Sequence, residues 1–250
     1  MASVNVVLPV FNREVALQRA VESVINQTHN DWKLIIVDDA STDSTYQIAC
    51  SFADTHPQIE AFRFNENSGN PAKPRNCAME QSNSDFIAFL DSDDEWHPRK
   101  LETQIHTMQE MQSPFSFTAY NRIRPDGFTK RVFDNFPVEL SLLDYLKNTC
   151  IAPSTVTINR QKFQHISFPE NYAQGEDFVY FCKLLRETDA LGIKQPLTNY
   201  HVSHDAISST PMKSAFNNAK RYWNLRQELG ISTVAISYIG YAAHALKKRM

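Results

Sequence analysis

Strand-like and helix-like segments alternate along the first 90 residues of this 250-residue chain, and this alternation limits its fold more than any other feature. Short apolar, β-branched runs lie at 4–9, 34–37, 59–64 and 86–90. Apolar side chains repeat with helical spacing between them, over 12–25, 42–53 and 75–81. Asn12 is a favourable N-cap for the first of these helices. The pattern predicts an α/β fold in which right-handed β-α-β units build a mostly parallel, Rossmann-like sheet flanked by helices.

The second half of the chain alternates less regularly. Strands are expected at 115–123, 129–133 and 154–158, and helices at 141–146 and 178–185. This mixture predicts a mixed sheet that continues the first domain. We therefore expect one domain over 1–210, with halves 1–100 and 101–210, followed by a helical extension over 211–250.

Composition excludes several classes of protein. Glycine is scarce, with six among 250 residues against a usual share of about 7%. None of the glycines forms G-x-G-x-x-G or a P-loop. A dinucleotide-binding fold and a P-loop NTPase are thus excluded. A net charge of −3 gives no broad surface for nucleic acid. The longest uncharged stretch, 231–246, is shorter than the roughly 20 apolar residues of a membrane span, so we expect a soluble chain. Its four scattered cysteines form no C-x-x-C pair and fit reduced thiols in the cytoplasm.

Acidic residues follow two of the predicted strands. Asp38 and Asp39 come after the second strand, and four acids lie within residues 91–95 after the fourth. Ligands of parallel α/β sheets bind at the carboxyl ends of the strands. Massed carboxylates repel one another, which favours a hard divalent cation that would hold a pyrophosphate with Arg75 as a second cationic contact. The alternative for 91–95 is capping of a helix that begins near Pro98.

Four segments together resemble a known family. They are Leu8-Pro9-Val10-Phe11-Asn12, Ile36-Val37-Asp38-Asp39-Ala40-Ser41, residues 67–76 and Phe89-Leu90-Asp91-Ser92-Asp93-Asp94. Their letters, order and spacing resemble the family-2 inverting glycosyltransferases of the GT-A fold, over roughly residues 3–205. Residues 116–120 and the helical tail further resemble bacterial members that build surface polysaccharides such as O-antigen and exopolysaccharide.

The resemblance implies a hexosyltransferase. Half 1–100 would bind a nucleotide sugar, with UDP the expected nucleotide, and half 101–210 would bind a glycan acceptor linked to a lipid diphosphate or free. Processive members carry a Q-x-x-R-W motif and membrane spans, and the sequence contains neither. One sugar would therefore be added per encounter.

The resemblance also implies roles for four residues near the nucleotide. Pro9 and Asn12 would lie along it, and Asp39 would accept a hydrogen bond from its base. Arg75 would lie near the nucleotide or its phosphates.

A metal site is implied in the same way. Asp91 and Asp93 form the family's D-x-D, with Asp93 the direct ligand of Mn²⁺ or Mg²⁺ and Asp91 nearer the ribose or the metal. His201 and His204 lie in a loop-like stretch. They are read either as ordinary solvated or buried histidines or as further contacts to the metal or diphosphate, with His204 the candidate ligand.

The catalytic base is expected at Gly175-Glu176-Asp177. Inverting transfer is one in-line displacement, which needs a carboxylate to take the proton of the acceptor hydroxyl. The resemblance implies Asp177 for this role, with Glu176 as the fallback. From the residues alone, the start of the helix predicted at 178–185 is the better explanation of both acids.

Three other functions compete with this one. A haloacid-dehalogenase-type phosphatase also has a D-x-D, but on its first strand and with Thr or Val two residues after the second Asp. In this chain the motif follows the fourth predicted strand, and the residue is Glu95. A sugar-1-phosphate nucleotidyltransferase would need a glycine-rich loop. A non-catalytic nucleotide-sugar-binding module would keep Asp39 and Asp93 without needing Asp177.

The C-terminal extension is basic. Its cationic residues are Lys220, Arg221, Arg226, Lys247, Lys248 and Arg249. A solvated helix face explains them, and the alternative is weak peripheral attraction to the anionic inner face of the cytoplasmic membrane.

Overall fold

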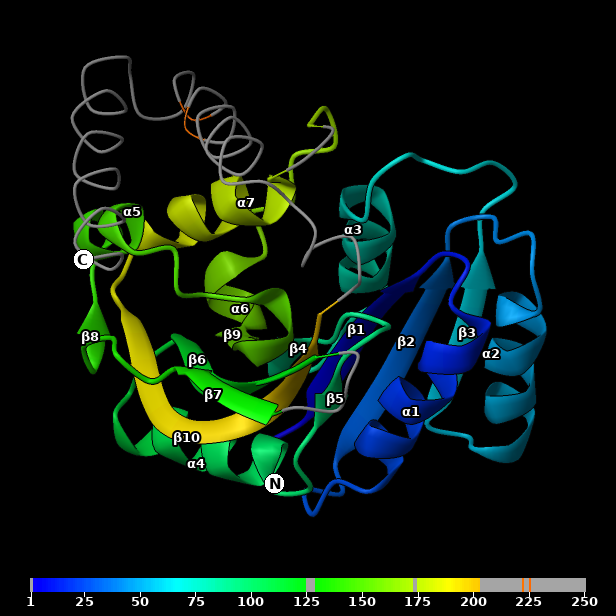
Figure 1. Ribbon diagram of the computed structural model, residues 1–250, viewed down its shortest axis with the longest axis horizontal. Coiled ribbons are helices and arrows are strands. Elements are labelled where there is room, and N and C mark those ends of the chain that lie inside the picture. The colour runs from blue at the N-terminus through cyan, green and yellow to red at the C-terminus, as the bar shows by residue number, and fades with distance from the viewer. Residues whose placement is uncertain (1, 125–128, 173–174, 203–221, 223–224, 226–250) are drawn as a thin grey trace.

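The computed structural model describes residues 2–124, 129–172, 175–202, 222 and 225 (Figure 1). Its strands are β1 (Val4–Val10), β2 (Trp32–Asp38), β3 (Ile59–Arg63), β4 (Phe86–Phe89), β5 (Glu95–Trp96), β6 (Phe115–Ile123), β7 (Thr129–Phe133), β8 (Glu139–Leu140), β9 (Val156–Asn159) and β10 (Ala190–His201). Its helices are α1 (Glu14–Ile25), α2 (Thr45–Thr55), α3 (Ala72–Glu80), α4 (Lys100–Glu110), α5 (Leu142–Lys147), the 3₁₀ turn η1 (Pro153–Thr155), α6 (Arg160–Phe163) and α7 (Glu176–Leu185).

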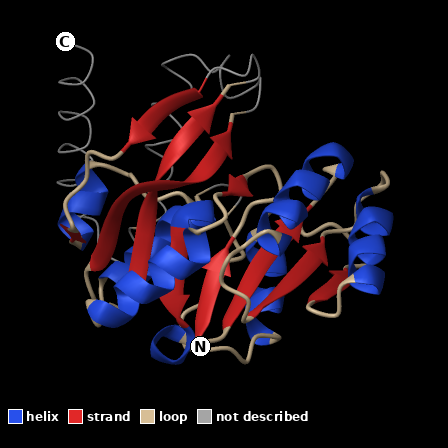
Figure 2. Cartoon of the chain, turned by 90° about the horizontal axis from the view of Figure 1, so that it is seen from below, coloured by secondary structure: helices blue, strands red, loops and turns tan. Residues whose placement is uncertain are grey.

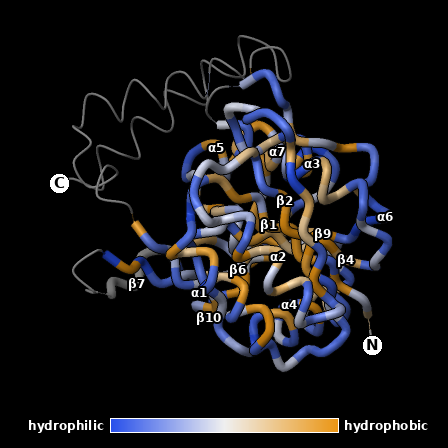
Figure 3. Tube along the Cα trace, turned by 90° about the vertical axis from the view of Figure 1, so that its right-hand side faces the viewer, coloured by the Kyte–Doolittle hydropathy of each residue, from blue (hydrophilic) through white to orange (hydrophobic). Residues whose placement is uncertain are grey.

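The predicted parallel sheet is confirmed. β3, β2, β1 and β4 are neighbours in this order, and each pair is parallel. Helices cover both faces, with α5 and α7 above the sheet and α4 below it in Figure 1. Every residue of β1 is buried, because Val6 and Leu8 pack on the face of α1 and α4 while Val7 packs on the opposite face with α7. Hydrophobic segments accordingly gather in the interior of the molecule (Figure 3).

The second half extends the same sheet, as predicted. β9 pairs antiparallel with both β4 and β6, and β10 pairs parallel with β6, so one sheet runs through both halves (Figure 2). β10 was missed in the sequence because Gly192 and Pro196 interrupt its pattern. The structure accommodates them with register shifts between Ile193, Pro196 and Thr198.

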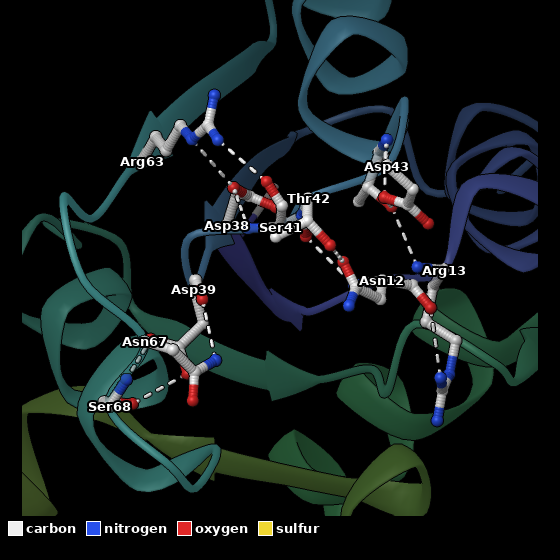
Figure 4. Close-up of polar contacts among 11 residues, drawn as sticks. Asn12, Arg13, Asp38, Asp39, Ser41, Thr42, Asp43, Arg63, Asn67 and Ser68 are labelled. Carbon is white, nitrogen blue, oxygen red and sulfur yellow. Dashed lines mark hydrogen bonds and ion pairs between the residues drawn. The ribbon is translucent and has the colours of Figure 1, made fainter.

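The expected N-cap at Asn12 is wrong. Helix α1 begins at Glu14 after Arg13, and no side chain caps it. Asn12 instead adopts a left-handed φ of 49°, which asparagine tolerates better than most residues. Its Oδ1 accepts a hydrogen bond of 2.8 Å from the amide of Thr42 (Figure 4). Asn12 therefore ties the loop after β1 to the loop after β2.

The helical extension over 211–250 and the boundary at residue 210 lie outside the described residues, apart from Tyr222 and Leu225. Both are buried, and the ring of Tyr222 lies 5.2 Å from that of Phe178 in α7. None of the helices in the described part of the chain combines the length and apolar content that crossing a bilayer requires.

Gly192 tests the packing of β10. A Cβ at this position would lie 2.6 Å from the carbonyl oxygen of Pro137 and 2.7 Å from the ring of Phe136. Because a backbone oxygen cannot move aside easily, Gly192→Ala is expected to lower the free energy of unfolding by about 1–3 kcal/mol. Chemical denaturation measures the change. Gln195→Ala, at an exposed position of the same strand, is the control and should be neutral; equal stability of the two variants would contradict this packing.

Candidate functional site

A cavity of about 450 Å³ opens at the carboxyl ends of the parallel strands. The loops after β1, β2, β3 and β4 and the end of β10 form its walls. Its lining residues are Pro9, Val10, Phe11, Arg13, Asp39, Asn67, Gly69, Asn70, Pro71, Pro74, Arg75, Asp91, Ser92, Asp93 and Tyr200. The site therefore lies at the edge of the sheet where ligands of parallel α/β folds bind.

Five of the residues singled out in the sequence line this cavity together. They are Pro9, Asp39, Arg75, Asp91 and Asp93. They come from the end of β1, the loop after β2, helix α3 and the loop after β4, spread over more than 80 residues of chain, so the fold, and not local sequence, brings them together.

The other singled-out residues lie elsewhere. Asn12 supports the wall through Thr42 without lining the cavity. Glu176 and Asp177 begin α7 behind the cavity, and only Glu176 is connected to it, through Arg75. His204 lies outside the described residues.

The two aspartates after β2 have different environments. Asp38 is fully buried, accepts a hydrogen bond from the amide of Ser41 and pairs with Arg63, at 3.3 Å from its Nε. Asp39 faces the cavity and accepts bonds from Ser68 N, Ser68 Oγ and Asn67 Nδ2 (Figure 4). These bonds from the described residues use three of about four acceptor positions of the carboxylate. Asp39 is thus held rigidly with room for one ligand N–H.

Arg75 joins the two halves of the protein. Its guanidinium is buried, and it donates from Nη2 to Asp91 Oδ1 at 2.6 Å and from Nη1 to Glu176 Oε1 at 3.0 Å. It also lies over the ring of Phe168, 5.2 Å from its centroid. Burial opposes the charge, but Asp91 and Glu176 outweigh burial and raise the pKa of Arg75 above its ordinary value. Arg75 is therefore a fixed cation between two carboxylates.

The acids at 91–95 do not cap the next helix. Helix α4 begins at Lys100 without a side-chain cap, and Glu102 is the acid in its first turn. The capping alternative for this cluster is therefore wrong. Asp94 is buried and accepts bonds from Ser154 Oγ at 2.5 Å and from the amide of His201 at 2.9 Å. Glu95 accepts from Asn199 and pairs with Arg19.

Asp93 is the most open of these acids. Its side chain is 41% exposed, and the nearest cation, Arg13 Nε, lies 3.9 Å from its Oδ2. Partial burial and the neighbouring Asp91 raise the pKa of Asp93, and Arg13 offsets this only in part. No three His, Cys, Asp or Glu side chains of the described residues gather to hold a metal ion by themselves. The hard oxygens of Asp93 and Asp91 nevertheless fit a divalent cation whose remaining ligands come from a bound diphosphate.

Sequence reasoning gave no site role to several side chains that line the cavity, among them Arg13, Asn67 and Tyr200. Arg13 follows the first strand directly and could have been included with Asn12. Asn67 belongs to a segment that was noticed, but its bonds to Asp39 depend on how the loop folds. Tyr200 belongs to the unpredicted strand β10, and its ring packs on Tyr120 with centroids 5.6 Å apart.

The sequence and the fold are those of a glycosyltransferase. The sequence matches Glycosyl transferase family 2 over residues 5–169, and the chain belongs to this family. The family expectation, the GT-A fold and transfer of a glycosyl group are thereby confirmed, and the phosphatase alternative is excluded.

Known relatives are bacterial. TuaG of Bacillus subtilis, named for teichuronic acid biosynthesis, is 36% identical over 251 residues, covering 99% of this chain and 97% of its own. WfaP of Escherichia coli is 33% identical, covering 92% of this chain and 88% of its own, and is named a UDP-Glc:alpha-D-GlcNAc-diphosphoundecaprenol beta-1,3-glucosyltransferase. The crystal structure of S. aureus TarS 1-349 in complex with UDP-GlcNAc shares the fold, with a TM-score of 0.74 and 20% identity over 98% of this chain and 73% of that one.

Arg75→Leu tests the bridge. The substitution leaves Asp91 and Glu176 without their shared cation, and breaking a buried ion pair costs about 3–5 kcal/mol. Burial and Asp177 already raise the pKa of Glu176 above its ordinary value, and loss of Arg75 raises it further. The folded variant then binds more protons than the unfolded chain, so its stability falls as the pH rises through this pKa.

We therefore expect the deficit of Arg75→Leu to be larger at pH 8 than at pH 5 in urea denaturation. Arg99→Leu removes an arginine from an exposed ion pair with Glu102 and is the control. It should change stability little at either pH. A deficit of Arg75→Leu that does not depend on pH would contradict the role of Glu176.

Proposed function

We propose that the protein is a non-processive, inverting glycosyltransferase that moves a hexose from a UDP-sugar to a sugar hydroxyl of a lipid-diphosphate-linked glycan. The observation that carries the proposal is the single cavity in which Asp39, Arg75, Asp91 and Asp93 meet. The side chains that line this cavity support a nucleotide-sugar donor. The acceptor class is suggested by the names of WfaP and of WfgD, which is 28% identical over 98% of this chain.

The nucleotide is proposed to lie along Pro9 with its base at Asp39. Asn67 and Ser68 hold the Asp39 carboxylate from one side, so it can accept a hydrogen bond from an imide N–H such as that of uracil. Arg75 is already saturated by carboxylates at two of its nitrogens. We therefore propose that Arg75 stabilises the sugar diphosphate mainly through its positive charge, and not through direct hydrogen bonds to a phosphate.

The diphosphate is proposed to leave from the end of the cavity where Asp93 lies. Asp93 and Asp91 would hold Mn²⁺ or Mg²⁺, which when bound would neutralise charge that develops on the leaving diphosphate. Arg13, beside Asp93, adds positive charge to the same end.

Asp177 is proposed as the base. Glu176 is committed to Arg75 and is buried, whereas Asp177 stays partly exposed and accepts a local bond from the amide of Phe178. A carboxylate oxygen that is paired with a buried guanidinium must break that ion pair before it can take a proton from an acceptor hydroxyl. Asp177 is thus the better choice to take the proton of the acceptor hydroxyl while that oxygen attacks the anomeric carbon.

Asp177→Asn tests the base. Because the amide cannot accept the proton, transfer should fall by at least about 100-fold. The affinity for UDP should stay within about twofold, since Asp177 does not line the cavity. UDP release measures turnover, and calorimetry with UDP and Mn²⁺ measures binding. Glu176→Gln is the comparison variant: because it disrupts the ion pair with Arg75, it should lower stability more than Asp177→Asn does. Unchanged turnover in Asp177→Asn would remove Asp177 from this role, whereas UDP binding without any turnover in the wild-type protein would favour a non-catalytic module.

Asp93→Ala tests the metal site. The wild-type protein should bind UDP more tightly in the presence of Mn²⁺ than in EDTA. In Asp93→Ala this difference should disappear, because the most open carboxylate of the cavity is lost. Calorimetry with and without metal measures the difference, and Glu95→Ala is the neighbouring control. A metal effect that survives in Asp93→Ala would place the ion elsewhere.

Membrane association is part of the proposal only through the acceptor. A lipid-linked glycan would bring the protein to the cytoplasmic face of the membrane. Sedimentation with vesicles of anionic and neutral lipids would show whether the protein binds the surface without its acceptor.

A further inference from the structure

Ser154 lies at the centre of a buried network beneath the acidic loop. It belongs to η1 and is fully buried, about 60 residues away from the loop in sequence. Its hydroxyl accepts a hydrogen bond of 3.0 Å from the amide of Asp91 and donates one of 2.5 Å to Asp94 Oδ2. One hydroxyl therefore binds the acidic loop at two points, on either side of Asp93.

The carbonyl oxygen of Ser154 extends this network. It accepts a bond of 2.7 Å from the indole Nε1 of Trp96 and one of 3.1 Å from Thr198 Oγ1 in β10. Asp94 completes the connection, because its other oxygen accepts from the amide of His201 at the end of the same strand. Ser154 thus holds the acidic loop against β10, the strand that brings Tyr200 to the cavity.

Other contacts hold the backbone of Asp93 but not its carboxylate. Arg19 donates to its backbone oxygen at 2.7 Å, whereas the side chain is 41% exposed and has Arg13 only at 3.9 Å. The backbone between Asp91 and Asp94 therefore sets where the Asp93 carboxylate points. A displacement of about 1 Å at a binding site can change activity by about 100-fold.

We propose that Ser154 is a positioning residue, which holds Asp91 and Asp93 in the geometry that receives the cation and diphosphate of the donor. The identity of the bound ligand in this inference rests on the proposed function. The claim that Ser154 holds the acidic loop does not depend on it. Ser154 touches no ligand in this proposal and acts through the backbone of the acidic loop.

The first test needs no ligand. Ser154→Ala removes both hydroxyl bonds, so hydrogen exchange of a peptide covering residues 90–96 should accelerate by about tenfold, as expected for loss of a bond to a charged group. Ser116→Ala is the matched control, because Ser116 is equally buried but bonds to Gln104 and not to the acidic loop. Its loop peptide should exchange as in the wild type. Equal exchange in the two variants would overturn the proposal.

The second test measures the consequence. The affinity for UDP with Mn²⁺ should weaken about tenfold in Ser154→Ala, while the affinity for UDP in EDTA should change less than twofold. Ser116→Ala should keep both affinities, whatever stability it loses. A purely structural role of Ser154 would weaken the two affinities alike and would overturn the proposal.

The two proposals fail in different ways. If wild-type protein does not bind UDP with Mn²⁺, the proposed function fails, and hydrogen exchange still decides whether Ser154 holds the loop. If wild-type protein binds and Ser154→Ala binds equally well, the positioning role alone fails. Ser154→Cys keeps nearly the same volume with weaker hydrogen bonds, and it replaces the alanine variant in both assays if that variant does not fold.

Discussion

The structure depends on a buried guanidinium that joins its two halves. Arg75 lies in α3 of the first half and contacts Asp91 after β4 and Glu176 at the start of α7. A buried cation needs counter-charges, and Arg75 receives them from Glu176, which is buried, and from Asp91, which is only partly buried. The charges of Arg75 and Glu176 are tolerable in the interior because each compensates the other. The donor side and the side that carries Asp177 are therefore fixed relative to each other before any substrate binds.

The acidic loop shows how one cluster of like charges divides its tasks. Asp94 is satisfied by Ser154 and a backbone amide, and Glu95 by Asn199 and Arg19. Asp91 is held by Arg75. Asp93 alone of these faces the cavity with a distant partner. Two of the four carboxylates are thus committed to structural contacts, Asp91 is held by Arg75 at the cavity, and Asp93 is the most open to solvent. This division supports the proposed cation site at Asp91 and Asp93.

Much of the fold follows from the sequence, because parallel strands buried on both faces are continuous apolar runs. β2 is predicted for this reason, and the helices around it follow from their spacing. β10 could not be predicted, since Gly192 and Pro196 break the alternation and its stability comes from pairing with β6. The loss matters for function, because Tyr200 comes to the cavity on this strand. Asn12 was placed in the correct loop but wrongly predicted to cap α1, since its side chain binds Thr42 in the loop after β2.

Acids at the start of a helix are ambiguous in sequence, and the two acidic groups of this chain show why. For 91–95 the ambiguity is resolved by distance along the chain, since α4 begins only at Lys100. For Glu176 and Asp177 it remains, because both do occupy the first turn of α7. What separates these two is a contact that no local pattern contains: Arg75, a hundred residues earlier, binds Glu176 and not Asp177. Sequence patterns can therefore nominate a pair of candidate bases, and the long-range ion pair of Glu176 is the observation that favours Asp177 in our proposal.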